Sequence, residues 1–211
     1  MHVFLIHAAL AFGATPTVAA PPLHAIRTRH RDGLRHRPRY RSAPNARAPK
    51  RRRGRRVAYR VMVEEAAGYP TEKFTAEVAA VLADKRGWTG SKKVWFHQRR
   101  RAQLRIILAT PPTVDRLCAP LDTNGYVSCF RNNRVVINVL RWRGGAAAWK
   151  GKLDDYRTYL LNHEVGHALG QRHRYCRQDG SAVPVMHPQT YGFMNCQANF
   201  WPLRVERRKL R

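Results

Sequence analysis

The chain has 211 residues, of which 44% are hydrophobic, and this leaves room for one compact domain with a buried core and a tail. It carries 40 Lys and Arg against 13 Asp and Glu, which gives a formal net charge of +27. Such a charge favours contact with anionic surfaces, but it identifies neither the kind of surface nor the fold.

Residues 1–20 have the pattern of a signal peptide. An apolar run from Val3 to Ala14 is followed by small residues and Pro16. A membrane span needs about 20 apolar residues, and this run is roughly twelve long. The stretch before Val3 lacks Lys and Arg, and Pro21 directly follows the small residues, so an irregular, uncleaved N-terminus is the alternative. We expect a protein that is secreted or held in the cell envelope.

Residues 21–56 are predicted to form a disordered, Arg-rich segment. Its part from residue 27 to residue 56 holds 14 Lys or Arg and one acid, Asp32, with almost nothing to bury. The segment is either a solvated tether that contacts an anionic polymer or membrane surface, or a pro-region. No set of aromatic residues interleaves with the arginines, so recognition of a specific nucleic acid is not expected.

The domain is predicted to occupy residues 57–211, and its first part alternates strands with one helix. Residues 57–63 alternate as a half-buried strand does, and residues 71–86 have the apolar spacing of a helix. Further strands are expected at 94–96, 104–108, 126–130 and 134–139, with a turn at Asn132-Asn133 between the last two. A helix over 153–169 closes the series, which predicts an α+β fold.

The stretch His163-Glu164-Val165-Gly166-His167-Ala168-Leu169-Gly170-Gln171-Arg172-His173 spells H-E-x-x-H-x-x-G-x-x-H. On a helix, His163 and His167 lie one turn apart on one face and can bind the same metal ion. Gly170 allows the positive φ at which a helix ends, so the chain can return His173 to the metal. Three histidines with an open fourth position are typical of catalytic Zn²⁺, and Glu164 is positioned to act as a general base.

This motif resembles that of the metzincin zinc metallopeptidases, in which a methionine turn follows the third histidine. Met186, in Pro184-Val185-Met186-His187-Pro188, is the candidate for that turn, with Met194 as the alternative. The resemblance implies a metzincin-like domain with a twisted, five-stranded mixed sheet, a backing helix and an active-site helix. It also implies an edge strand, assigned to residues 126–130, that pairs with a peptide substrate.

Two features set the chain apart from the metzincin families. Arg174 stands where they tend to have an acid, a small hydroxylic residue or Pro after the third histidine. The phrases at residues 162–167 and 198–202 are more similar to a family of secreted actinobacterial proteins of unknown function with a metzincin-like signature.

Four cysteines in a chain that is expected to be exported indicate two disulfides. The preferred pairing is Cys118–Cys129 and Cys176–Cys196, because the second bridge would clamp the loop that carries Met186. A Cys-rich second metal site is the alternative, but it lacks a close Cys-x-x-Cys pair.

We therefore expect a secreted, monomeric zinc metallopeptidase that acts on a peptide or protein substrate. His163, His167 and His173 are predicted to hold Zn²⁺, and Glu164 is predicted to deprotonate the attacking water. Tyr191 is either a transition-state donor or an ordinary core tyrosine. The alternative function is a non-catalytic, zinc-stabilised envelope module with a polyanion-binding tail; a basic nucleic-acid-binding protein is a third class, for which no base-reading motif is found.

Overall fold

The computed structural model describes residues 37–46 and 53–210, which belong to one compact unit. The predicted signal peptide, residues 1–20, lies outside the described residues, as do residues 21–36 and 47–52 of the predicted disordered segment. Among the residues that are described, no helix is both long and apolar enough to cross a membrane.

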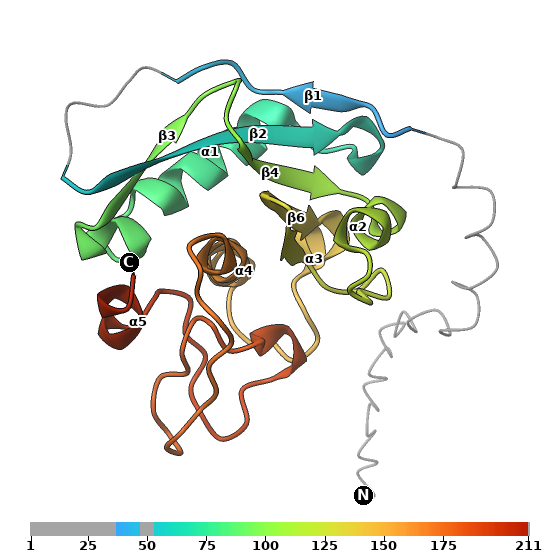
Figure 1. Ribbon diagram of the computed structural model, residues 1–211. Helices are drawn as coiled ribbons and strands as arrows, with labels where there is room; N and C mark the ends of the chain where they lie inside the picture. Colours follow the sequence, from blue (N-terminus) through green and yellow to red (C-terminus); the bar gives the residue numbers. More distant parts are fainter. Residues whose placement is uncertain (1–36, 47–52, 211) are drawn as a thin grey trace, which may run out of the picture. The chain divides into compact units, whose positions relative to one another are not determined.

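The centre of the unit is a mixed sheet of six strands in the order β1-β2-β4-β6-β5, with β3 also paired to β2 (Figure 1). The strands are β1 (Tyr40–Ser42), β2 (Arg55–Glu64), β3 (Val94–Gln98), β4 (Leu104–Ala109), β5 (Cys129–Arg131) and β6 (Arg134–Asn138). β2, β3, β4 and β6 run parallel, whereas β1 and β5 are antiparallel to their neighbours. The α+β prediction is confirmed at this level.

The helices are α1 (Thr71–Ala83), α2 (Pro111–Cys118), α3 (Val139–Gly144), α4 (Leu153–Ala168) and α5 (Arg204–Arg208). Short 3-10 helices lie at η3 (Glu65–Ala67), η4 (Trp88–Ser91) and η5 (Gln189–Tyr191).

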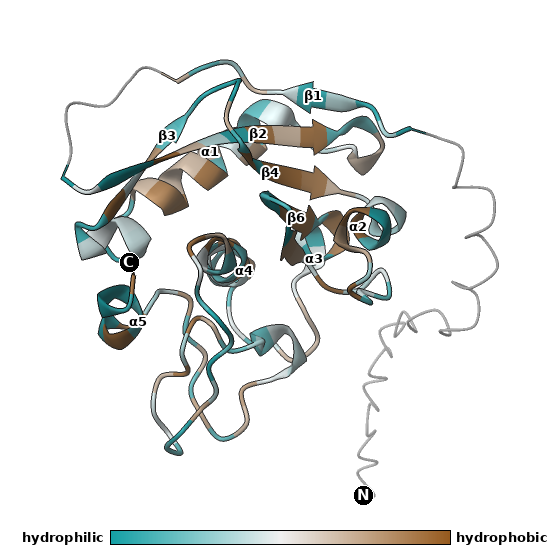
Figure 2. Ribbon diagram, viewed as in Figure 1, coloured by the Kyte–Doolittle hydropathy of each residue, from teal (hydrophilic) through white to brown (hydrophobic). Residues whose placement is uncertain are grey.

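The strand register explains why β4 and β6 each contain a continuous apolar run, Ile106–Ala109 and Val135–Ile137. Val61, Ile106 and Val135 are successive partners across the sheet and face the main core, which α1 and α4 complete. Their sequence neighbours Ile107 and Val136 face the opposite side and pack with α2 in a second cluster. Parallel strands buried on both faces need apolar residues at every position. Figure 2 shows the resulting hydrophobic stretches of β2, β4 and α1.

The sheet differs from the prediction in having a sixth strand. β1 lies inside the 21–56 segment, so disorder is the wrong prediction for Tyr40–Ser42. These residues pair with Met62–Glu64, and Arg39 and Arg41 lie near Glu65. The strand is short and polar, so its own residues do not predict it and it forms by pairing with β2.

Three predicted boundaries are also corrected. The helix expected over 71–86 ends at Ala83, because the backbone of Asp84 is extended and its carboxylate accepts from the Arg86 backbone. The strand expected at 126–130 is confined to Cys129–Arg131, because residues before it turn at Asn124 and Gly125, both with positive φ. The strand expected to reach Val139 ends at Asn138, whose side chain accepts from the Leu140 backbone and caps α3.

One turn and one helix start each follow from a pair of residues. Asn132 and Asn133 both have positive φ (48° and 57°), as the predicted tight hairpin requires. Pro111-Pro112 follows β4 and begins α2, a helix that the sequence analysis missed.

Candidate metal centre

Helix α4 places His163, Glu164 and His167 and ends at Ala168. The Gly170 backbone, at φ 83°, donates to the His167 carbonyl, and the Gln171 backbone donates to the Gly166 carbonyl. These two bonds are those of a Schellman motif, in which a left-handed glycine ends a helix. The predicted glycine therefore follows the helix end, and the chain turns back towards the metal face.

The three histidines converge as the motif spacing predicts. Their ligand atoms all lie within 4.8 Å of one another, and the Nε2 atoms of His163 and His167 are 3.2 Å apart. His163 is buried, His167 is half-buried and His173 is exposed, so one side of the group faces solvent. This group can hold a metal ion.

Backbone carbonyls fix the protonation of two of these rings. The Nδ1 atom of His163 lies 2.9 Å from the Val185 carbonyl, and that of His167 lies 2.9 Å from the Gln171 carbonyl. A carbonyl only accepts, so Nδ1 carries the proton in each ring and the Nε2 lone pair is left for a metal. Burial lowers the pKa of all three histidines, that of His163 to about 3, which keeps the imidazoles neutral.

Glu164 is buried beside the ligands, with 5% of its surface exposed, and it lines one cavity together with the three histidines. Burial raises the pKa of its carboxyl to about 8. A carboxylate in this environment binds a proton more readily than one in water, which suits a general base.

Met186 lies in a turn closed by the His187 backbone, which donates to the Pro184 carbonyl at 3.0 Å. The Met186 side chain is fully buried against α4: a Cβ placed on Gly166 would lie 2.3 Å from its sulfur. Met194, the alternative, is 74% exposed and does not fill this role. The need for glycine at position 166, between the two helical histidines, was missed by the sequence analysis.

Glu206 anchors this turn from α5. Its buried carboxylate accepts from the backbone N–H groups of Met186 at 2.9 Å, Val185 at 3.1 Å and Leu203 at 2.7 Å. The same Val185 residue holds His163 through its carbonyl. The sequence analysis missed Glu206, although a single acid within the basic C-terminal run was a usable signal.

A cavity of about 370 Å³ lies over the histidines and Glu164. One wall comes from Val127–Phe130, at the start of the edge strand β5, and the other from Pro188, Thr190 and Tyr191. Tyr191 is 70% exposed and is therefore not a core tyrosine. Its neighbour Thr190 is hydrogen-bonded through its hydroxyl to the Tyr156 hydroxyl at 3.0 Å. Tyr126 lies outside the strand, with its ring between Arg141 and Tyr191.

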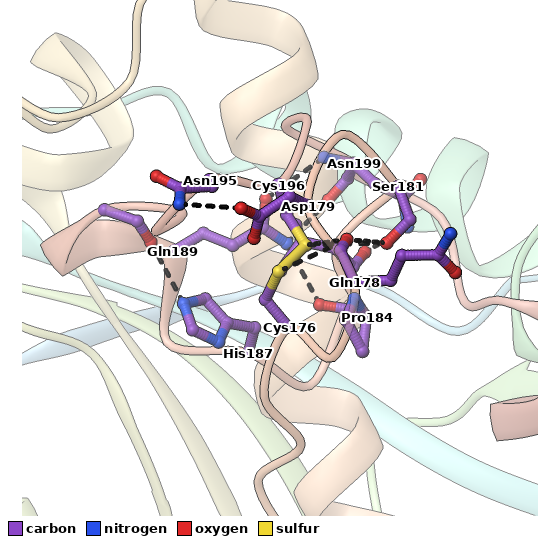
Figure 3. Close-up of a disulfide and its surroundings, with 12 residues drawn as sticks. Cys176, Gln178, Asp179, Ser181, Pro184, His187, Gln189, Asn195, Cys196 and Asn199 are labelled. Atoms are coloured by element: carbon purple, nitrogen blue, oxygen red, sulfur yellow. Dashed lines mark hydrogen bonds between the residues drawn. A yellow bond between two sulfur atoms is a disulfide. The ribbon is translucent and has the colours of Figure 1, made fainter.

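Both predicted disulfides are confirmed. Cys118–Cys129 joins the end of α2 to β5, and Cys129 also lines the cavity. Cys176–Cys196 closes the loop that holds Met186, and Asp179 and Asn195 are hydrogen-bonded beside it (Figure 3). Paired cysteines are typical of proteins that fold in an oxidising compartment.

Comparison with known protein families gives one match. The family described as "Protein of unknown function (DUF3152)" matches residues 34–204, and the chain therefore belongs to it. A search among curated proteins finds no match. The matched range includes β1, all three histidines and Glu164.

Proposed function

We propose that this member of the DUF3152 family is a zinc-dependent hydrolase that cleaves peptide bonds. The observation that carries the proposal is the placement of three metal-facing imidazole nitrogens and a buried carboxylate in the wall of one open cavity. A structural zinc site would be closed by a fourth protein ligand, and the metal-ligand group found in the described residues contains three histidines.

The donor chemistry fits zinc. Neutral imidazole suits this ion, and the two carbonyl-bonded rings present their Nε2 atoms without a tautomer change. When bound, zinc would supply a Lewis acid that polarises a peptide carbonyl and makes water more acidic.

Glu164 would perform the proton transfers. It is adjacent to His163 in the helix but is not one of the three converging ligands, so its carboxylate is free to take a proton from the attacking water. The same group would then deliver that proton to the leaving amine, which makes it first a general base and then a general acid.

The cavity wall offers a place for an extended peptide. β5 is the last strand of the sheet and pairs with β6 alone among the described strands. A peptide can add to such an edge through backbone hydrogen bonds. Together with the elongated histidine motif and the Met186 turn, this edge supports the resemblance to metzincins.

We also propose that the protein works outside the cytosol, secreted or in the cell envelope, since both disulfides close in the structure. Contact of residues 21–56 with an anionic polymer or membrane surface stays a prediction, as does a monomeric state.

The test compares the full chain with Glu164→Gln and with the control Glu72→Gln, which changes an exposed acid at the start of α1. Each is purified without chelator, its zinc content is measured, and it is incubated with a diverse peptide library. We expect about one zinc per chain in all three proteins. Hydrolysis should fall by ~10²–10⁴ in Glu164→Gln only.

Two results would contradict the proposal. A chain that holds no transition metal and takes up none has no zinc centre. A chain that binds zinc but cleaves no peptide would be the non-catalytic envelope module instead.

A further inference from the structure

A second cavity lies on the other side of His173 from the cavity over the histidines and Glu164. It has a volume of about 520 Å³ and is lined by residues within 172–184, from the end of the histidine motif onwards, and by Leu203, Val205 and Lys209 in and beside α5. We call it the basic cavity, because Arg172, Arg174, Arg177 and Lys209 are among its lining residues. His173 lines both cavities, so the third metal-ligand candidate stands in the wall between them.

The carboxylate of Glu206 interacts electrostatically with one cation of the basic cavity, Arg174. Glu206, the acid of α5, is fully buried, and its oxygens accept from three backbone N–H groups. The other three cations, Arg172, Arg177 and Lys209, are exposed and form no ion pair among the described residues, so the cavity presents a positive potential to a ligand.

The Arg174 side chain keeps hydrogen-bonding capacity that the described residues do not use. Its backbone N–H donates to the Met186 carbonyl, but its Nε atom is buried without a hydrogen-bond partner among the described residues. A buried donor without a partner is costly, and a carboxylate matches a guanidinium with two parallel hydrogen bonds. Arg174 directly follows His173, so such a carboxylate would lie next to the metal centre.

We propose that the basic cavity is a subsite for an acidic side chain of a peptide substrate. This inference rests on the proposed peptidase function and adds the substrate class, namely polypeptides with Asp or Glu on one side of the cleaved bond. A peptide that fills the cavity over the histidines can pass His173 and enter the basic cavity, because both share that residue as a wall. The exposed apolar side chains of Tyr175 and Val205, also in its lining, suit the stem of such a residue and its neighbours.

The residues that line the basic cavity favour a peptide over a polynucleotide as its ligand. Binding of single-stranded nucleic acid uses successive aromatic side chains on which bases stack, and Tyr175 is the one aromatic residue other than His173 in the lining. A carboxylate side chain needs one concave, cationic recess, which is what the residues form.

The test measures binding in the full-length Glu164→Gln protein, so that it does not depend on turnover. The probes are fluorescent decapeptides of mixed apolar sequence in which Glu is moved through the positions, together with the same peptides carrying Gln. We expect at least one Glu position to bind about tenfold tighter than its Gln counterpart. Salt should weaken this preference.

Two charge-removal variants locate the preference. Arg172→Gln/Arg177→Gln/Lys209→Gln removes three exposed cations of the basic cavity, and Arg174→Gln is tested separately. The matched control is Arg99→Gln/Arg100→Gln/Arg101→Gln, three exposed arginines after β3, which pairs with β2 and not with β5. The preference for Glu should fall towards one in both cavity variants and persist in the control, with zinc content unchanged in all.

The outcomes are distinct. Equal loss in the control triple variant would mean a general effect of net charge and would overturn the subsite. So would a cavity variant that loses binding of a single-stranded homopolymer or of anionic vesicles but keeps its preference for Glu peptides. A preference that maps to the cavity while the parent chain cleaves none of the peptides would support the subsite and count against the peptidase.

Discussion

Residues 53–168 and residues 169–203 are held together in different ways. In the first region, parallel strands and α1 and α4 bury apolar side chains, and backbone ladders satisfy the polar groups. In the second, regular structure is limited to η5 and one isolated bridge between Ala182 and Gln197. Buried loops must find other partners for their backbone groups.

Side-chain amides supply those partners in the second region. Gln189 is fully buried, and its side chain bonds with Asn199 through both the Asn199 N–H and the Asn199 carbonyl. Asn199 in turn donates to the carbonyls of Val183 and Trp201. Figure 3 shows this crowded loop around the Cys176–Cys196 bridge.

The metal centre needs both regions. α4 supplies His163, Glu164 and His167, whereas the irregular region supplies His173 and the Val185 and Gln171 carbonyls. The helix therefore sets the spacing of the histidine ligands, while a loop held by specific side chains sets their orientation. The following experiments separate these contributions.

Removal of a helical ligand should have the largest effect. His167→Ala deletes one of three converging nitrogens, so we expect loss of bound metal and hydrolysis reduced to background. A control, His97→Ala, removes a buried histidine of β3 that is outside the metal-ligand group found among the described residues. Elemental analysis and peptide cleavage are measured on the same samples, and metal retained by His167→Ala would refute the assigned ligand set.

Loss of the Glu206 carboxylate should loosen the Met186 turn and with it the orientation of the His163 ring. Glu206→Ala leaves three backbone N–H groups without their acceptor, which should cost about 4 kcal/mol of the free energy of unfolding. Metal affinity should fall about 10–100-fold, as for other changes behind a ligand. Urea unfolding and zinc titration measure both, and Glu206→Gln, which keeps one acceptor oxygen, should be milder. Unchanged affinity would mean that the turn does not orient His163.

The two disulfides provide a matched pair, one in each region. Replacement of both cysteines of Cys176–Cys196 by Ser should cost about 3 kcal/mol, and the shorter Cys118–Cys129 loop about as much or slightly less. Zinc affinity should fall only when the Cys176–Cys196 bridge is removed, since that bridge closes the Met186 loop. Equal effects of the two replacements on affinity would remove the distinction between the regions.

A methyl group at position 166 tests the contact between the regions. Gly166→Ala places a Cβ against the Met186 sulfur and the Trp88 ring, so overpacking should cost about 2 kcal/mol despite the better helix propensity of Ala. Gly144→Ala is the control, because a Cβ there meets nothing within 4 Å. Thermal unfolding of both variants gives the comparison. Gly166→Ala combined with Met186→Ala should recover part of the loss that is due to crowding.

Much of the first region could be predicted because its signals are local. Alternating apolar residues indicated β2, short apolar segments indicated β4 and β6, helical apolar spacing indicated α1, and the histidine motif indicated α4. β1 and α2 were missed because neither carries such a pattern: three polar residues become a strand by pairing with β2, and Pro111 reads equally as a strand end and as a helix start.

The ligand candidates and the glycine that ends their helix could be read from the sequence, which also favoured the disulfide pairing found in the structure. Each of these depends on residue type and on spacing along the chain. The folded structure was needed to show which carbonyls orient the imidazoles, that Glu206 holds the Met186 turn, and that four cations share a cavity with His173. Those contacts join residues far apart in the sequence or depend on backbone atoms that every residue has, so no local pattern encodes them.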